Sequence, residues 1–387
     1  MIGPVRDLRI GVIGYGLRSG LVRLAHRPGA GSALVGVCDP RAERGEQALA
    51  DAGGGLAVVE TVEDLLALDV DAVFVLSPDH LHKEHAVAVL EAGAAAYLEK
   101  PMAITTAGCD RILDTAARTG SKVYVGHNMR HMPVVTEMRR LVVEGAIGSV
   151  KAVWCRHFVG HGGDFYFKDW HAERAKSTGL LLQKGAHDID VIHWLAGGYT
   201  RSASAIGTLA VYGDAERDGA GGYLPPTGWA ADELTTWPPA AQTGINPAAD
   251  VEDLSMMLMT LDNGVLASYQ QCHFTPDYWR SYTVIGDAGR LECFGNGPGG
   301  EIRVWNSRKA GYAEPDLVVP VPDAVGGHGG ADPSIVEEFL GYVRDGRATL
   351  TSVVAAREAV AAGFAATQSL RSGGVPVAIP PRPSAAG

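Results

Sequence analysis

The stretch LRIGVIGYGLRSG, residues 8–20, decides the fold. Its first six residues are mostly apolar and predict a buried strand, and its last residues open a predicted helix. Between them, Gly14 and Gly16 take the first two positions of a G-x-G-x-x-G turn, with Ser19 at the third and Gly20 one residue late. Glycines let the backbone turn tightly and let a pyrophosphate approach backbone N–H groups. The stretch therefore predicts a dinucleotide-binding turn.

An acidic residue follows the next predicted strand, Ala33–Cys38. Asp39 lies 20 residues after Ser19, where a carboxylate accepts hydrogen bonds from ribose hydroxyls. A turn-forming role before Pro40 is the alternative. Because a carboxylate repels a 2′-phosphate, we expect NAD as the cofactor, while the nearby Arg41 leaves NADP open.

The pattern of apolar residues differs between the two halves of the chain. Up to residue 126, short apolar runs alternate with helical patterns, which predicts a parallel sheet covered by helices. After Pro133 longer β-like segments appear, and Asn263-Gly264 predicts a hairpin between two of them. We predict an α/β protein with a Rossmann domain at 1–130 and a C-terminal α/β domain at 131–387 with a large, mostly antiparallel open sheet. The helical segment 333–370 could pack back on the first domain. Residues 213–250 are predicted to form a long excursion over the surface.

Composition narrows the functional classes. The 387 residues carry a formal net charge of −11, which disfavours non-specific binding to nucleic acid or anionic membranes. Apolar residues make up 46%, enough for a packed core, and no apolar run is long enough for a membrane span. The five cysteines are widely spaced without a C-x-x-C pair. We expect a soluble protein of the reducing cytoplasm.

Further motifs occur in a characteristic order. They are Ser77-Pro78-Asp79-His80-Leu81-His82, Glu99-Lys100-Pro101, Gly185-Ala186-His187-Asp188-Ile189-Asp190, Glu337-Glu338-Phe339-Leu340 and Gln368-Ser369-Leu370. Together with the glycine turn, this series resembles the Gfo/Idh/MocA family of NAD(P)-dependent oxidoreductases, which act mostly on sugars, inositols and their derivatives. The resemblance covers nearly the whole chain.

The resemblance implies roles for particular residues. Lys100 would be a catalytic or substrate-orienting cation beside the nicotinamide, next to a candidate cis bond to Pro101. His187 would exchange a proton with the substrate hydroxyl. The residues expected at the cofactor are Gly14, Tyr15, Gly16, Leu17, Arg18, Asp39, Arg41, Ser77, Pro78, His82, Glu99, Lys100 and Asn128.

One position departs from the family pattern. The residue four before the histidine is usually Asp but is Gln183 here, followed by Lys184. If Gln183–Ala196 is helical, Lys184, His187 and Asp190 share one face and can meet one substrate. We therefore add Lys184 and Asp190 to the catalytic candidates.

Other side chains are candidates for binding the substrate. Those expected to reach it are Asn128, Arg130, Trp170, His171 and Lys184, with Tyr166 and Trp229 as further rings that could stack on a sugar. The spacings His80-x-His82-x-x-His85 and His127-x-x-x-His131 resemble metal-ligand spacings, but structural histidines are the favoured interpretation and we expect no metal.

The expected activity is a dehydrogenase or reductase that transfers a hydride between NAD(H) and a secondary hydroxyl or keto group of a sugar, cyclitol or glycoside. Two alternatives stay open. One is a glycosidase or lyase that retains NAD and works by oxidation, elimination and reduction. The other is a sugar or NAD sensor without chemistry. The resemblance also implies a homodimer or homotetramer formed through the C-terminal sheet.

Overall fold

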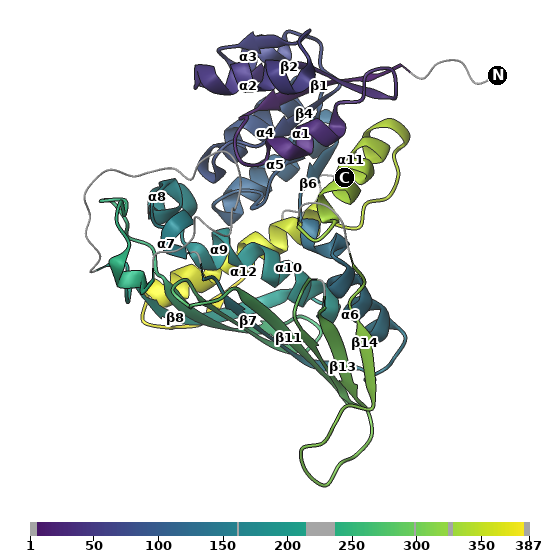
Figure 1. Ribbon diagram of the computed structural model, residues 1–387, viewed down its shortest axis with the longest axis vertical. Coiled ribbons are helices and arrows are strands. Elements are labelled where there is room, and N and C mark those ends of the chain that lie inside the picture. Colours follow the sequence, from purple (N-terminus) through teal and green to yellow (C-terminus); the bar gives the residue numbers. More distant parts are fainter. Residues whose placement is uncertain (1–5, 161, 214–236, 298, 324–327, 383–387) are drawn as a thin grey trace, which may run out of the picture. The chain divides into compact units, whose positions relative to one another are not determined.

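The chain forms two compact units. The computed structural model describes residues 6–160, 162–213, 237–297, 299–323 and 328–382 (Figure 1). The first unit contains residues 1–128 and 332–357 with the chain from 381 onward, and the second contains residues 129–331 and 358–380. Each unit is described by itself below.

A six-stranded parallel sheet organises the first unit, in the order β3-β2-β1-β4-β5-β6. Its strands are β1 (Leu8–Ile13), β2 (Ser32–Cys38), β3 (Ala57–Val59), β4 (Ala72–Val75), β5 (Ala95–Leu98) and β6 (Val123–Val125). The order reverses between β1 and β4, which is where open α/β sheets bind ligands. This arrangement confirms the predicted Rossmann fold.

Helices connect these strands. They are α1 (Ser19–Ala25), α2 (Ala42–Ala52), α3 (Val62–Leu66), α4 (His82–Glu91) and α5 (Thr106–Thr119), with the 3₁₀ helix η1 (Asp79–Leu81) before α4. The ends of α5 follow local chemistry, because the Thr105 side chain accepts a hydrogen bond from the Gly108 N–H and Gly120 adopts a left-handed conformation.

A helix from late in the chain completes the core of the first unit. The segment predicted as helical at 333–370 forms two helices, α11 (Ala331–Asp345) and α12 (Val353–Arg371). Phe339 of α11 is fully buried, with its ring 5.2 Å from that of Phe74, 5.4 Å from Tyr97 and 5.8 Å from Tyr124. Helix α11 therefore belongs to the aromatic core beneath the parallel sheet.

A nine-stranded sheet organises the second unit, in the order β14-β13-β12-β11-β7-β10-β9-β8-β15. Its strands are β7 (Val150–Phe158), β8 (Thr200–Thr208), β9 (Leu254–Leu261), β10 (Leu266–Cys272), β11 (Trp279–Gly286), β12 (Arg290–Phe294), β13 (Glu301–Trp305), β14 (Leu317–Pro320) and β15 (Val377–Ala378). Strands β7 and β10 run parallel, and the other described neighbours are antiparallel. The predicted hairpin at Asn263-Gly264 joins β9 to β10.

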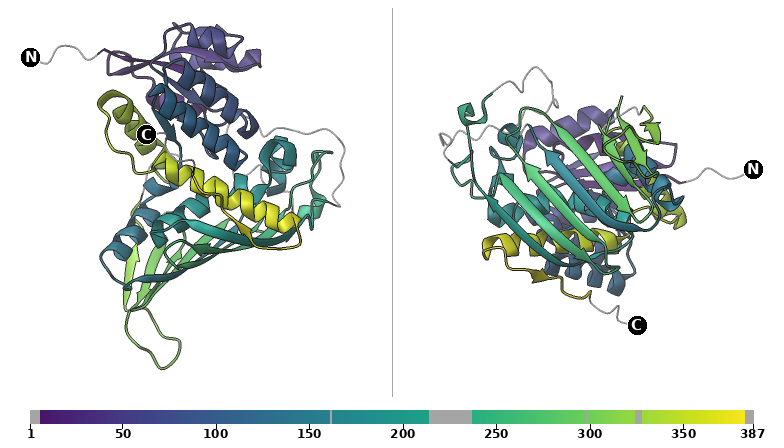
Figure 2. Two further views of the ribbon diagram at one scale, coloured as in Figure 1. Left: turned by 180° about the vertical axis from the view of Figure 1, so that it is seen from behind. Right: turned by 90° about the horizontal axis from the view of Figure 1, so that it is seen from below.

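Helices cover one face of this sheet. The helical segments of the unit are η2 (Asn128–His131), α6 (Pro133–Val143), α7 (Gly162–Phe165), η3 (Trp170–Ala172), α8 (Arg174–Ser177), α9 (Leu180–Gln183), α10 (Gly185–Ala196) and η5 (Pro239–Ala241). Helix α10 packs on β7 and β10, and α6 packs on β12 and β13. The right view of Figure 2 looks onto the opposite face, which no helix of the described residues covers. Much of the predicted excursion at 213–250, Trp229 included, lies outside the described residues.

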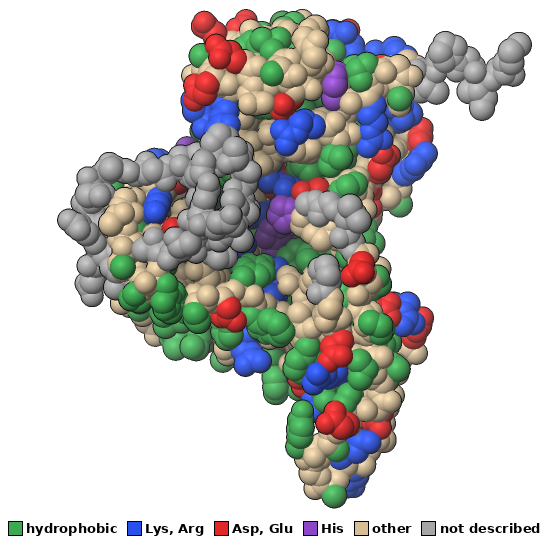
Figure 3. All heavy atoms as spheres, viewed as in Figure 1, with side chains coloured by type: hydrophobic (Ala, Val, Ile, Leu, Met, Phe, Trp, Pro, Cys, Tyr) green, Lys and Arg blue, Asp and Glu red, His purple; other side chains and the backbone are tan. Residues whose placement is uncertain are grey.

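Charged side chains of both signs are interspersed over the visible face of the described residues (Figure 3). Within the described part of the chain, no helix combines the length and apolar character that a membrane crossing needs. The same residues contain no group of three or more His, Cys, Asp or Glu side chains that could hold a metal ion.

We predict that Phe339→Ala destabilises the first unit. Removing a fully buried aromatic ring leaves a cavity among Phe74, Tyr97 and Tyr124, so the free energy of unfolding should fall by about 3–5 kcal/mol. Urea unfolding followed by circular dichroism measures the change. Tyr312→Ala is the matched control, because that ring is 86% exposed, and an equal loss in both variants would contradict the packing described.

Candidate active site

The predicted dinucleotide turn has the geometry of a close backbone approach. Gly14 follows β1 with φ +85°, and a Cβ atom placed there would lie 3.0 Å from backbone atoms of Leu76 and Ser77. A side chain at this position would therefore be strained and would push apart the two loops that follow β1 and β4. The residues present fit a dinucleotide at this edge of the sheet.

Asp39 is tied to the same turn from the end of β2. Its carboxylate accepts hydrogen bonds from the Tyr15 N–H at 2.8 Å and the Arg41 N–H at 3.0 Å, and the Arg41 Nε lies at 3.1 Å. Burial by itself raises the pKa of Asp39, but the Arg41 side chain and these backbone donors outweigh it and lower the pKa. Asp39 is therefore an anion at neutral pH, beside a partly exposed guanidinium.

Arg18 extends from the glycine turn into the protein. Its Nε donates to Glu99 at 2.9 Å, and its two terminal nitrogens lie 3.1 and 3.0 Å from the two carboxylate oxygens of Asp332. The Asn128 amide also lies 3.4 Å from Asp332. The Arg18 guanidinium thus holds two carboxylates, so it is the backbone of Arg18 that we propose for the cofactor.

Lys100 lies in the loop that follows β5, and a hydrogen bond to Glu99 fixes its backbone. The backbone N–H of Lys100 donates to Glu99 at 3.1 Å, and the Lys100–Pro101 peptide bond is cis, as predicted. Glu99 accepts from Arg18 with its other oxygen. One carboxylate therefore links the glycine turn to the predicted catalytic lysine.

The Ser77 loop is held by two histidines of the adjoining helix. Ser77 Oγ lies 2.9 Å from His85 Nδ1, and the carbonyl oxygen of Ser77 lies 2.8 Å from His82 Nε2. His82 is only 1% exposed. Its ring nitrogens therefore contact backbone carbonyls within the protein, and its expected place at the cofactor stays a prediction.

The second unit presents its candidates along one helix. Lys184 sits between α9 and α10 with helical backbone angles, and His187 and Asp190 follow on α10, so the expected helix begins at Gly185 rather than at Gln183. Lys184 Nζ lies 5.4 Å from the centroid of the Tyr166 ring, within cation–π range. His187 and Asp190 are both buried.

Arg130 and Asp190 form one buried ion pair. The Nε and Nη2 atoms of Arg130 each lie 2.8 Å from an Asp190 oxygen, and Arg130 also lies over the Trp194 ring at 5.2 Å. The predicted substrate contact and the predicted catalytic carboxylate are thus a bidentate pair. Their roles have to be considered together.

The predicted aromatic residues form a cluster of their own. Trp170 and His171 stack at 3.8 Å, and the His171 ring lies 4.7 Å from Phe165 and 5.5 Å from Tyr166. His171 and Tyr166 are buried. The rings therefore contact one another beside Lys184, and Trp170 and Phe165 are the partly exposed members.

A buried polar cluster behind α10 was missed from the sequence. Asp188 is fully buried, and Arg280 Nε lies 2.8 Å and Tyr282 Oη 2.5 Å from its Oδ1, while His157 Nδ1 lies 3.1 Å from its Oδ2. The sequence offered one signal for this cluster, because Arg280 and His157 are polar residues at strand positions that face inward. The two residues lie opposite each other in the β7–β11 register. The cluster anchors the helix turn that carries His187 to the sheet.

Burial and charge set the ionisation of this cluster. Burial by itself raises the pKa of Asp188, but Arg280 and His157 hold that pKa well below its usual range. Burial and the Arg280 charge lower the pKa of His157 to about 3. Asp188 and Arg280 are therefore a charged pair beside a neutral imidazole.

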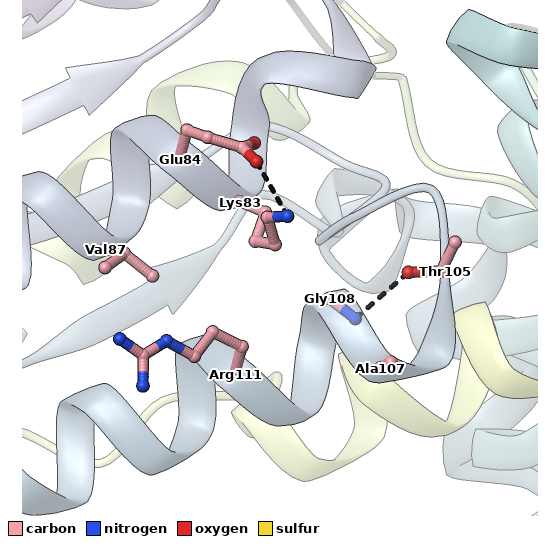
Figure 4. A pocket seen from close by; sticks show the side chains of 7 residues that line it. All are labelled: Lys83, Glu84, Val87, Thr105, Ala107, Gly108 and Arg111. Atoms are coloured by element: carbon pink, nitrogen blue, oxygen red, sulfur yellow. Dashed lines mark hydrogen bonds and ion pairs between the residues drawn. The ribbon is translucent and has the colours of Figure 1, made fainter.

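A surface hollow of about 440 Å³ lies elsewhere, between α4 and α5 (Figure 4). Its lining residues are Lys83, Glu84, Val87, Thr105, Ala107, Gly108 and Arg111. The Lys83 ammonium lies 2.7 Å from Glu84, so its charge is balanced locally. None of the predicted site residues lines this hollow, and we assign it no ligand.

Family models match both halves of the chain. A model described as "Oxidoreductase family, NAD-binding Rossmann fold" matches residues 8–127, and that of the same family's C-terminal alpha/beta domain matches residues 139–379. Among curated relatives, the oxidoreductase YteT of Bacillus subtilis is 26% identical over 70% of this chain and 72% of its own length. Inositol 2-dehydrogenase 1 of Saccharopolyspora erythraea is 33% identical over 49% of this chain, which spans 54% of that relative.

Solved structures share the fold over nearly the whole chain. An oxidoreductase domain protein from Kribbella flavida covers 97% of this chain and all of its own, with a TM-score of 0.76 and 20% identity. A levoglucosan dehydrogenase in complex with NADH and L-sorbose covers 97% of this chain and 99% of its own, with a TM-score of 0.76 and 18% identity. At these identities the likeness concerns the fold alone.

We predict that the stability of the second unit depends on pH through His157. The pKa of this residue falls from 6.5 to about 3 on folding, so between these values the unfolded chain binds a proton that the folded chain does not. Stability therefore rises with pH across this window, by about 1.4 kcal/mol per pH unit for one histidine. In His157→Gln the slope of unfolding free energy between pH 4.5 and 6 should be smaller by about that amount, measured by urea unfolding.

The matched control for this measurement is His328→Asn, at an exposed position. Its slope should equal that of the unaltered chain. An unchanged slope in His157→Gln would mean that the imidazole is not held neutral by its surroundings.

Proposed function

The chain belongs to the Gfo/Idh/MocA family of oxidoreductases, and we propose that it transfers a hydride between NAD(H) and a secondary hydroxyl or keto group of a sugar, cyclitol or glycoside. The observation that carries the proposal is the shared Glu99 carboxylate. It joins Arg18 of the dinucleotide turn to the backbone of Lys100. The cofactor-binding turn and the predicted catalytic lysine are thus parts of one hydrogen-bonded structure.

The substrate class rests on relatives. The curated relatives include inositol 2-dehydrogenases, which are named for a cyclitol. A cyclitol and the ring form of a sugar both present secondary hydroxyls on a ring. Because this chain spans about half the length of the curated inositol dehydrogenases that it matches, the particular substrate is left within this class.

The NAD-binding Rossmann half supplies the cofactor site. We propose that the backbone of Gly14–Arg18 holds the pyrophosphate, that Asp39 binds the adenosine ribose, and that Ser77, Pro78 and Asn128 line the nicotinamide end. Bound NAD accepts or supplies the hydride. The anionic Asp39 favours NAD over NADP, and the neighbouring Arg41 is the residue through which NADP could be accepted.

We propose that His187 exchanges the proton with the substrate oxygen, because an imidazole titrates closest to neutral pH. The Lys100 ammonium orients that oxygen and stabilises negative charge as the proton leaves. Lys184 supplies a second cation beside Gln183, the position at which the family pattern has Asp, and Trp170 and His171 bind the sugar ring. Asp190 orients Arg130 through their bidentate ion pair, which makes Arg130 a fixed donor for the substrate.

We further propose that two copies of the chain pair through the uncovered face of the nine-stranded sheet. Several outward-facing residues of its central strands are apolar and exposed, including Trp154 at 51%, Leu258 at 65% and Leu266 at 58%. Trp154 and Leu258 flank the polar Ser268 in one row across β7, β10 and β9. Large apolar side chains exposed on one sheet face in this way favour association with an identical face.

Lys100→Met and His187→Asn should each lower kcat by about 10²–10⁴, since each removes a group that acts on the reacting oxygen. The dissociation constant for NADH should change by less than about threefold, because the other predicted cofactor contacts stay. A screen of sugars and inositols, with NADH absorbance as the signal, identifies the substrate first. Lys309→Met and His328→Asn are the controls and should keep full activity.

Full activity in Lys100→Met would contradict its role. Glycoside turnover without net NADH would instead favour the retained-cofactor glycosidase. NAD binding without turnover of any member of the screen would favour the sensor.

Leu258→Glu should convert the oligomer to a smaller species. A carboxylate on a buried apolar interface is unpaired and costs several kcal/mol in association. Light scattering after gel filtration measures the mass. The control is Val143→Glu, since Val143 is 66% exposed on α6 rather than on the sheet. An unaltered mass in Leu258→Glu would show that this face is not the interface.

A further inference from the structure

His82 connects the two loops that flank the predicted nicotinamide position. Its Nδ1 lies 2.7 Å from the carbonyl oxygen of Pro101 and its Nε2 lies 2.8 Å from the carbonyl oxygen of Ser77. The first loop follows β5 and carries Lys100, and the second follows β4. One side chain therefore spans the ends of two adjacent strands.

The His82 ring is enclosed within the first unit. His82 opens α4, is 1% exposed, and belongs to the same unit as both loops. Burial lowers its pKa to about 4, although the two carbonyl oxygens and Glu99 act in the opposite direction. A neutral imidazole has one N–H to donate, and the shorter contact, from Nδ1 to Pro101, is the better candidate for that bond.

We infer that His82 is a positioning residue, whose Nδ1–H bond to the Pro101 carbonyl sets the Lys100 side chain against the Ser77 loop. On the N-terminal side, the Glu99 carboxylate accepts a hydrogen bond from the Lys100 backbone N–H at 3.1 Å. On the C-terminal side, His82 contacts the carbonyl oxygen of Pro101, the residue after Lys100. The ammonium is thereby oriented before any ligand arrives, and little ordering cost is left for binding. This inference relies on the proposed function only in taking Lys100 as the reacting residue.

Two amide variants separate the two nitrogens of the ring. In His82→Asn the amide nitrogen has the reach of Nδ1 and can still donate to Pro101. In His82→Gln it has the reach of Nε2 and can still donate to Ser77. A role in positioning Lys100 requires the two variants to differ, whereas a general need for a buried polar group at this place does not.

The readout is the rate at which an acylating reagent labels the Lys100 amine, followed by peptide mass spectrometry over a range of pH without and with NADH. Without NADH, the reagent should label Lys100 about fivefold faster in His82→Gln than in His82→Asn, which is the factor that corresponds to one lost hydrogen bond. His82→Asn should resemble the unaltered chain. His85→Leu is the matched control, because His85 contacts the Ser77 hydroxyl and neither carbonyl, and it should leave the rate unchanged.

Equal labelling of Lys100 in the two amide variants would overturn the inference. So would an equal rise in His85→Leu. Failure of NADH to protect Lys100 in the unaltered chain would instead count against the proposed function, and the comparison without NADH would still decide the role of His82.

A measurement on the unaltered chain covers the case in which a variant does not fold. Nitrogen NMR of ¹⁵N-histidine-labelled protein reports which ring nitrogen of His82 carries the proton. A proton on Nδ1 agrees with the inference. A proton on Nε2 alone overturns it.

Discussion

The first unit depends on one partly buried guanidinium. Arg18 holds Glu99 at the end of β5 and Asp332 at the start of α11, while its own backbone belongs to the turn after β1. Burial opposes its charge, but the two carboxylates outweigh this and raise the pKa of Arg18. Removing one partner of such a buried set leaves an uncompensated charge, at a cost of about 3–5 kcal/mol. Three segments that are distant in sequence are therefore fixed by one side chain.

The second unit also contains an ion pair that joins separate segments of the chain. The Asp188–Arg280 pair joins the first turn of α10 to β11, and its remaining lone pairs are taken by His157 and Tyr282. Buried ion pairs contribute little net stability, since desolvation offsets the attraction, but their geometry admits few alternatives. In both units a residue proposed for chemistry directly adjoins a member of such a pair, Lys100 next to Glu99 and His187 next to Asp188. Each ion pair therefore fixes the backbone beside a residue that we propose for the chemistry.

Local pattern predicted much of the secondary structure. The predicted strand Leu8–Ile13 has the same bounds in the structure, and the predicted strand Ala33–Cys38 differs from the observed Ser32–Cys38 by one residue, because an apolar run is a property of the strand itself. Strand β8, Thr200–Thr208, was missed, since its serines, threonines and alanines carry no apolar signal. Its pairing with β9 makes it a strand. The helical segment 333–370 was recognised, but not its division into two helices.

The sequence by itself determined the family, the dinucleotide turn and the identity of the candidate residues, because these follow from residue type and spacing along one element. Only the tertiary structure decided what those residues touch. It paired Arg130 with Asp190, turned the Arg18 side chain toward Glu99 and Asp332, and placed His82 between two backbone carbonyls. Each of these contacts joins separate segments of the chain, and a side chain's partner across such a distance depends on the packing of the elements between them.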